Sequence, residues 1–260
     1  MSKLKNSVTG FFLAWQFFSS VPVNKQLHMN KKSVTWMYAS LPIIGLIMGS
    51  TLGTGIYLIW SFSNLSNILL AILLVVGMIV LTGGLHLDGW TDMSDAFFSY
   101  GDKEKRLAIL DDPRTGAFGV ISVVCLLLLK VGFIFETLEK GQMEVIAYIA
   151  VIPFIARIGM LLYFLTMPTS KKIGLAAYFK GEVITKMLWL ILTIFTAIFI
   201  ILVCYFKFLN LLIVFIVMIV AILLYRKWTT KHFGGMSGDL LGALGEGLEV
   251  LLWLVVLFCI

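Results

Sequence analysis

Acidic residues cluster in one part of the sequence. Seven of the 14 acids lie between positions 88 and 112, namely Asp88, Asp92, Asp95, Asp102, Glu104, Asp111 and Asp112. On a helix, the first three would project within about 60° of one another. Like charges on one face repel unless a cation or water separates them. Carboxylate oxygens suit a hard cation, so we predict that Asp88, Asp92 and Asp95 bind Mg²⁺, with a solvated acidic surface as the alternative.

Residues suited to phosphate chemistry flank this cluster. Glycines at positions 83, 84 and 89 surround His86 and Asp88 and permit a close backbone approach. His86 is a candidate ligand or proton acceptor, although a histidine at a helix end more often only forms a local hydrogen bond. Further along, Asp112 precedes Arg114, which can hold a phosphate through two hydrogen bonds or simply anchor the chain at a membrane surface. The candidate catalytic residues are therefore His86, Asp88, Asp112 and Arg114.

A second acidic group lies near the carboxyl end. Asp239 follows the glycine-rich run from 234 to 238, Glu246 would project within about 20° of it on a helix, and Glu249 lies one turn beyond Glu246. An ionised carboxylate at mid-bilayer costs at least about 2.5–3.5 kcal/mol, so these acids should face the protein interior, and Arg157 needs a partner for the same reason. We predict a polar substrate pocket, with a purely structural Arg157–Glu pair as the alternative. Its residues would be Arg157, Gly238, Asp239, Glu246 and Glu249.

The elements that carry these residues are predicted to be membrane helices. Of the 260 residues, 60% are apolar and 13% are charged, against about 45–50% and about 25% in soluble domains, which excludes a soluble single domain. Blocks of about 20 apolar residues can span a bilayer. They predict an all-α polytopic bundle of seven helices, forming one domain over 1–260. The blocks are approximately 41–60, 66–85, 117–136, 145–166, 187–206, 208–225 and 240–260, the sixth being short.

The distribution of cations predicts the orientation. If the amino terminus is cytoplasmic, 16 of the 20 Lys and Arg residues lie in cytoplasmic segments, and only Lys140 and Lys207 lie in outside loops. The segments 86–116 and 226–249, which hold the two acidic groups, would then face the cytoplasm, and the carboxyl terminus would lie outside. The net charge of +6 is thereby explained as a topology signal, and no nucleic-acid partner is expected.

The first 40 residues are predicted to lie along the membrane surface. Their aromatic residues, among them Phe11, Phe12 and Trp15, and the lack of a clear cleavage pattern favour a retained interfacial helix over a signal peptide. On the first long span, glycines recur every four residues, which predicts close packing of another helix. These are Gly45, Gly49 and Gly53. The cysteines lie far apart in apolar blocks, so neither a disulfide framework nor a zinc site is expected; they are Cys125, Cys204 and Cys259.

Taken together, these motifs resemble the cobalamin synthase family, the adenosylcobinamide-GDP ribazoletransferases. The resemblance covers essentially the whole chain. Its most specific parts are the segment from Gly83 to Gly89 with Asp92 and Asp95, and the segment from Gly234 to Asp239. Supporting matches are Ser20–Val23, Leu41–Gly45, Arg114, Arg157, Gly174-Leu175, Glu246 and Glu249.

The resemblance implies a transferase of cobalamin biosynthesis in the cell (inner) membrane. Such an enzyme joins adenosylcobinamide-GDP to α-ribazole or α-ribazole 5′-phosphate, releases GMP and requires Mg²⁺. A homo-oligomer and a complex with other enzymes of the pathway both remain open as partners.

Two other functions are alternatives to this one. A CDP-alcohol phosphotransferase also breaks a pyrophosphate with clustered aspartates, but its pattern requires an arginine soon after the first Asp-Gly pair. Here Met93 stands at the position of that arginine after Asp88-Gly89. A transporter with intramembrane acids is the non-enzymatic alternative. An acid cluster outside the spans argues against it.

Overall fold

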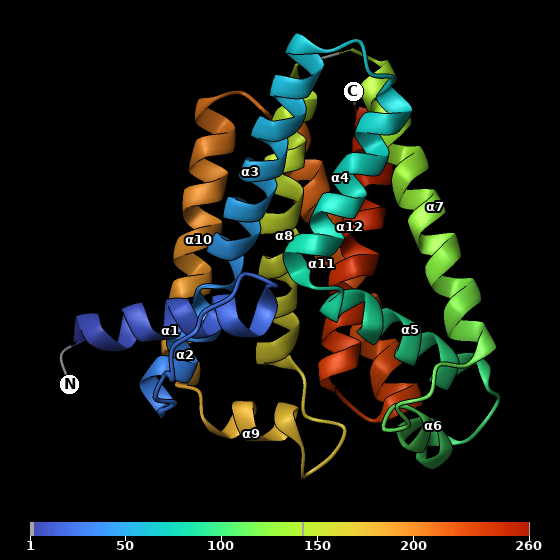
Figure 1. Ribbon diagram of the computed structural model, residues 1–260. Coiled ribbons are helices and arrows are strands. Elements are labelled where there is room, and N and C mark those ends of the chain that lie inside the picture. The colour runs from blue at the N-terminus through green and yellow to red at the C-terminus, as the bar shows by residue number, and fades with distance from the viewer. Residues whose placement is uncertain (1–2, 142, 260) are drawn as a thin grey trace.

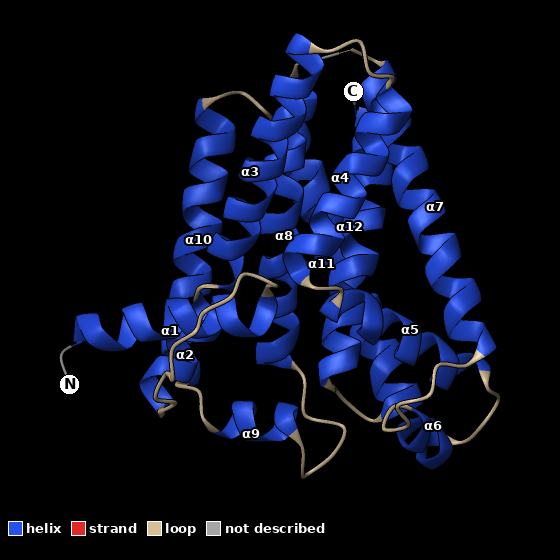
Figure 2. Cartoon of the chain, in the orientation of Figure 1, coloured by secondary structure: helices blue, strands red, loops and turns tan. Residues whose placement is uncertain are grey.

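Every regular element in the described residues, 3–141 and 143–259, is a helix (Figure 2). The computed structural model contains α1 (Lys3–Phe18), α2 (Lys31–Ala39), α3 (Leu41–Phe62), α4 (Asn67–Thr82), α5 (Leu85–Phe98), α6 (Lys103–Ile109), α7 (Ala117–Glu139), α8 (Glu144–Thr166), α9 (Leu175–Gly181), α10 (Thr185–Tyr205), α11 (Asn210–Phe233) and α12 (Gly238–Cys259). Six helices, counting α2 with α3, are long and apolar enough to cross a membrane, and α4 qualifies only together with α5. The predicted polytopic bundle is therefore confirmed.

Two of the predicted spans differ from the structure at their ends. The sixth span, 208–225, is a helix as predicted, but its short length is wrong, because α11 has 24 residues and continues to Phe233. A search for apolar residues stops at Arg226, whereas the helix continues through polar residues whose side chains contact the protein; the Arg226 guanidinium donates to the Thr166 carbonyl at 3.4 Å. The second span, 66–85, ends at Thr82, and a bend of 93° separates α4 from α5.

The bend between α4 and α5 depends on two glycines. Gly83 and Gly84 have φ angles of +66° and +74°, a left-handed conformation that residues with a Cβ adopt at a cost. Their N–H groups donate to the carbonyls of Val80 and Ile79, at 3.2 and 3.1 Å, and so close the end of α4. As a result, α5 turns away from the direction of α4 and runs across the end of the bundle (Figure 1).

The short helices gather at one end of the molecule. In Figure 1, α1, α5, α6 and α9 lie at the end where the long helices α7, α10 and α12 begin, while the carboxyl terminus lies at the opposite end. We call this end, with the loops 99–102, 110–116, 167–174 and 234–237, the loop-rich end. It contains both acidic segments that the sequence singles out, apart from the part of α12 that runs into the bundle.

Helices α8 and α12 form the centre of the bundle, and the glycine stripe of α3 packs on α8. A Cβ at Gly45 would lie 2.5 Å from the Pro153 carbonyl oxygen, and one at Gly49 would lie 2.6 Å from that of Ala150. Only hydrogen fits at these positions, so the predicted close packing is confirmed. The three cysteines are free, as expected.

Candidate active site

The two acidic segments meet where α5 crosses α12. A Cβ at Gly89 would lie 2.6 Å from the Asp239 carbonyl oxygen, and one at Gly242 would lie 3.2 Å from the Cα of His86. The glycines allow the two backbones to approach this closely, because any larger residue at position 89 would collide with α12. The contact brings Asp88 and Asp239 to one place.

A cavity of about 210 Å³ opens beside this crossing. Asp88, Asp239 and His86 form one of its walls. Aromatic residues from α1, α2, α8 and α9 form much of the rest, and they are Phe17, Phe18, Tyr38, Phe164 and Phe179. We call this space the aromatic cavity.

A second cavity of about 300 Å³ adjoins the aromatic cavity and shares Asp239 with it. We call it the polar cavity, because Thr169, Ser170, Lys171 and Asp111 line it. The Lys171 ammonium group donates to the Asp111 carboxylate and, at 3.0 Å, to the Leu107 carbonyl. The two cavities therefore present carboxylates, one ammonium group and aromatic rings around Asp239.

Backbone pairing between two loops shapes the polar cavity. The Met236 N–H donates to the Pro168 carbonyl at 2.8 Å, and the Ser170 N–H donates to the Met236 carbonyl at 2.9 Å. A Cβ at Gly235 would lie 2.6 Å from the Pro168 oxygen, so the pairing requires a glycine at this position. This pairing holds the loop 167–174 beside the start of α12.

Four carboxylates lie near one another at the α5–α12 crossing. Asp88 is exposed and Asp92 is half-buried on α5, which lies past the bend and across the end of the bundle. Burial first, and then the carboxylates of Asp88, Asp239 and Asp95, raise the pKa of Asp92 to about 6. This repulsion is the electrostatic condition under which a bound cation stabilises a site.

Asp95 serves a second purpose in the structure. Its carboxylate is buried and accepts the N–H groups of Gly116 and Gly119, at 2.5 and 2.8 Å. These are amides of the first turn of α7, so Asp95 caps that helix with a negative charge at its positive end. Its assignment as a metal ligand stays a prediction.

The donor set near Asp88 fits Mg²⁺. Among the residues that the structure describes, no group of three or more His, Cys, Asp or Glu side chains is already arranged to hold a metal. Mg²⁺ is usually bound by one or two carboxylates together with substrate phosphates and waters, so a complete protein cage is not expected. Asp88 and Asp239 line the aromatic cavity, and Asp92 lies one turn beyond Asp88 on α5, so these residues can supply carboxylate oxygens.

Asp112 and Arg114 pair with each other in the exposed loop before α7. The Arg114 guanidinium donates to both Asp112 carboxylate oxygens, at 2.6 Å for the shortest contact. These hydrogen bonds lower the pKa of Asp112 to about 2. Neither residue lines the aromatic or the polar cavity. Their predicted catalytic roles therefore require the loop to reach the substrate and remain predictions.

Glu246 and Glu249 belong to a buried ion cluster inside the bundle. The Lys130 ammonium group contacts Glu246 at 2.9 Å and Glu249 at 2.6 Å, and Arg157 contacts Glu249 at 2.6 Å. All four side chains are almost fully buried, and their charges sum to zero. Lys130 is a partner that the sequence analysis missed, although a lone lysine within a span was the available signal.

The structure thus separates the residues predicted to form one substrate pocket. Asp239 and Gly238 line both cavities, whereas Glu246, Glu249 and Arg157 do not line either. The Arg157–Glu249 pair corresponds to the structural alternative. His86 lies between the two groups, and its buried Nε2 atom has no hydrogen-bond partner among the described residues.

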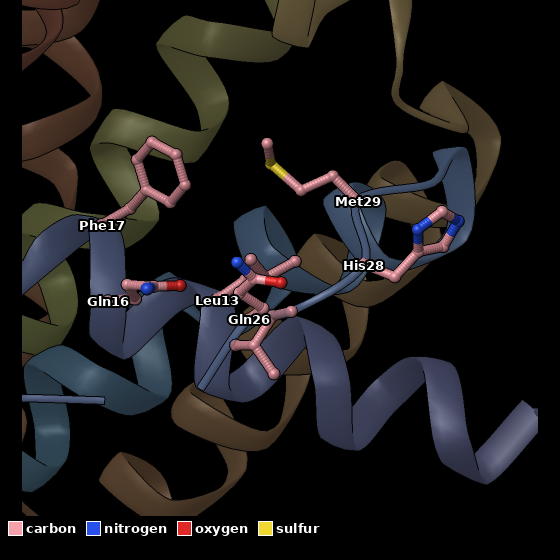
Figure 3. A pocket seen from close by; sticks show the side chains of 7 residues that line it. Leu13, Gln16, Phe17, Gln26, His28 and Met29 are labelled. Carbon is pink, nitrogen blue, oxygen red and sulfur yellow. The ribbon is translucent and has the colours of Figure 1, made fainter. Parts of the chain in front are cut away.

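A larger pocket of about 640 Å³ lies between α1 and the segment 26–29 (Figure 3). Its lining includes Gln16, Phe17, Gln26, His28 and Met29 but no Asp, Glu, Lys or Arg. It therefore offers neither a carboxylate for a divalent cation nor a lysine or arginine for a phosphate. The site around Asp239 is therefore the candidate for chemistry.

Comparison with known proteins identifies the family of the chain. The family model for cobalamin-5-phosphate synthase matches residues 10–257. A protein from Geobacillus sp. (strain WCH70) named adenosylcobinamide-GDP ribazoletransferase is 34% identical over 255 residues, covering 97% of each chain. Proteins of the same name from Geobacillus thermodenitrificans and Clostridioides difficile are 36% and 32% identical; the matches cover 95% of this chain in both cases and 94% and 96% of those proteins. No solved structure matches the chain.

The match to the family model spans nearly the whole chain and includes both acidic segments and the loops that pair beside them. This protein therefore belongs to the cobalamin-5-phosphate synthase family.

Proposed function

We propose that this protein joins adenosylcobinamide-GDP to α-ribazole, or to α-ribazole 5′-phosphate, and releases GMP. Membership of the family and the name of its relatives support this reaction. One observation supports a site for this reaction. Asp88 and Asp239, from distant parts of the sequence, line one cavity, and a second cavity that contains Lys171 adjoins it.

The reaction is a displacement at phosphorus. A ribose hydroxyl oxygen of the ribazole forms a bond to the phosphorus on the corrinoid side of the pyrophosphate, and the bond from this phosphorus to the oxygen of GMP breaks in line. The hydroxyl proton passes to a base, for which Asp88 and His86 are the candidates because both line the aromatic cavity. GMP leaves with the bridging oxygen.

We propose that Asp88, Asp92 and Asp95 hold Mg²⁺ from α5. When bound, the cation would neutralise the negative charge that develops on the phosphoryl oxygens and on the leaving group. The raised pKa of Asp92 supports a cation among these carboxylates. The hydrogen bonds from Gly116 and Gly119 hold the Asp95 carboxylate in a fixed orientation toward α7.

The loop 167–174 provides a place for the phosphates and the guanine nucleotide. Lys171 lies in the polar cavity, and Thr169 and Ser170 offer hydroxyl groups there. An ammonium group binds a phosphate as a compact positive charge. Arg114 can exchange its Asp112 partner for a phosphate without burial cost, because its side chain is 86% exposed.

We propose that the loop-rich end faces the cytoplasm and that the protein resides in the cell (inner) membrane. The positively charged segments lie at this end, as the positive-inside rule requires. Leu4, Val8 and Phe12 form an exposed apolar stripe along α1, which suits a helix that lies in the membrane surface.

The test is turnover by the purified protein in detergent. With adenosylcobinamide-GDP, α-ribazole and Mg²⁺, GMP should be released in step with formation of the corrinoid product, and omitting α-ribazole should stop both. Asp88→Asn should lower kcat by orders of magnitude while the protein remains folded. Release of CMP from CDP-alcohols in place of this reaction would overturn the proposal.

A further inference from the structure

The aromatic residues of the aromatic cavity come from four separate helices. Tyr38 of α2 stacks on Phe164 of α8, with ring centroids 4.0 Å apart and planes inclined by 17°. Phe179 of α9 meets the ring of Phe17 edge-on at 5.4 Å. Phe18, at the end of α1, meets the ring of Tyr38 edge-on, with ring centroids 6.0 Å apart.

These rings do not serve as membrane anchors. Aromatic side chains at a membrane surface normally contact the lipid headgroups. Here, however, Tyr38, Phe164 and Phe179 are 4%, 1% and 6% exposed, and they surround a cavity that also contains the Asp88 and Asp239 carboxylates. Buried rings around a space beside catalytic acids are typical of a binding site for a flat apolar group.

The size of the cavity limits what it can hold. At about 210 Å³ it is smaller than the pockets of about 300–1,000 Å³ that take drug-sized ligands. A corrinoid is too large to be enclosed in it, whereas a single ring system of the size of a nucleoside base is accommodated.

The chemistry of the walls selects among such bases. Guanine and adenine carry several donors and acceptors on their edges, and each one left unpaired in a buried site costs about 1–3 kcal/mol. The aromatic side of the cavity offers few polar partners. A benzimidazole-type base has only one ring nitrogen that is not bonded to the sugar, so it loses the least on burial there.

We infer that the aromatic cavity is the subsite for the base of the ribazole acceptor. This inference rests on the proposed function. The base lies among Phe18, Tyr38, Phe164 and Phe179, and the attached ribose faces the opposite wall, where its hydroxyl reaches the carboxylates of Asp88 and Asp239. The adjoining polar cavity remains for the pyrophosphate of the other substrate.

The test makes the same phenylalanine-to-leucine substitution at three positions, two on different faces of α1 and one on α9. Phe18→Leu and Phe179→Leu each remove a ring from the aromatic cavity but keep an apolar side chain, and neither residue lines the polar cavity. Phe12→Leu is the matched control, because Phe12 is 44% exposed on α1 and does not line the cavity. Kd for α-ribazole is measured by calorimetry in detergent, together with KM for adenosylcobinamide-GDP and the melting temperature.

We expect the Kd for α-ribazole to rise about tenfold in Phe18→Leu and in Phe179→Leu, equivalent to about 1.4 kcal/mol, with no change in Phe12→Leu. The KM for adenosylcobinamide-GDP should stay within twofold. An unchanged Kd in folded variants, or a rise confined to the KM for adenosylcobinamide-GDP, would overturn the subsite assignment. Normal turnover by the unmodified protein would leave the proposed function standing in either case.

A competition experiment on the unmodified protein tests the same inference without relying on variants that fold. Free 5,6-dimethylbenzimidazole should displace α-ribazole competitively, because it occupies the same aromatic cavity, whereas GMP should not. Displacement by GMP without displacement by the benzimidazole would assign the cavity to guanine and overturn the inference.

Discussion

At the scale of single residues, the acids of α5 have different environments although they share one face. Asp88 is open to the cavity, Asp92 is half-buried among other carboxylates, and Asp95 is buried and bound to α7. Sequence spacing predicts the shared face but not this division. The three acids should therefore respond differently to the same substitution.

Asp95→Asn should lower stability more than its two neighbours do. The substitution replaces one of the two acceptor oxygens with an NH2 group, which cannot accept the N–H of Gly116 or Gly119, and it removes a charge at a helix amino terminus. We expect a loss of about 1–3 kcal/mol, seen as a lower melting temperature in detergent. Asp92→Asn is the control and, measured in EDTA, should not lower the melting temperature. If Asp95→Asn melted normally but lost turnover, metal binding would be the main role of Asp95.

The stability of the metal-free protein should depend on Asp92 in a defined pH range. Its pKa is raised from 3.8 to about 6, so the folded state holds a proton that the unfolded state releases. The stabilisation is present below about pH 4 and is lost as the pH rises through about 6. Melting temperatures in EDTA should show this fall, Asp92→Asn should lack it, and Mg²⁺ at pH 7 should reverse it. Asp112, with a pKa of about 2, stays ionised throughout this range.

At the scale of elements, one buried cluster joins three helices. Lys130 on α7, Arg157 on α8, and Glu246 and Glu249 on α12 form ion pairs away from both cavities. Buried pairs of this kind add little net stability compared with apolar residues, but breaking one leaves an uncompensated charge. The cluster therefore fixes how α7, α8 and α12 pack against one another.

Glu246→Gln should destabilise the fold by about 3–5 kcal/mol while turnover per folded molecule survives. Adding Lys130→Met removes the surplus positive charge and leaves Arg157 paired with Glu249, so the double variant should be more stable than the sum of the single changes predicts. Thermal melts and specific activities of the two single variants and the double variant provide the test. Full stability with lost turnover would instead indicate that Glu246 contacts substrate.

At the scale of the whole molecule, charge and shape are asymmetric. The loop-rich end carries the short helices, the cavities and most of the cations, whereas the opposite end has short loops with Lys140 and Lys207. The sides of the bundle expose large apolar residues, for example Leu128, Ile201 and Leu224. Such a surface suits lipid, and the charge asymmetry predicts the orientation.

Cysteine labelling in intact cells tests this orientation. The native Cys125, Cys204 and Cys259 are free, so they must first be replaced by serine or alanine. Cysteines introduced at Lys103 and Lys180 should react only with membrane-permeant reagents, and one introduced at Lys207 should react with impermeant ones. The reverse pattern would show that the proposed topology is inverted.

The sequence by itself determined the membrane class, five of the seven spans to within a few residues, the glycine stripe of α3 and the family. These follow from local properties: a spanning helix must be about 20 apolar residues long, and motifs such as Gly83–Gly89 are contiguous. The end of α11 was predicted too early, because the search for apolar residues stops where the helix continues through polar residues, from Arg226 to His232.

Only the tertiary structure decided which charged groups meet. The crossing of α5 and α12 places Asp239 beside Asp88. The packing of α7 pairs Lys130 with Glu246 and brings the N–H groups of Gly116 and Gly119 to the Asp95 carboxylate. Helical spacing had grouped Asp239 with Glu246, since both lie on one helix face. Their depths along α12 differ, however, so one carboxylate reaches the cavities and the other reaches the buried cations. Depth and partner depend on which helices pack together, and no pattern within a single helix encodes that choice.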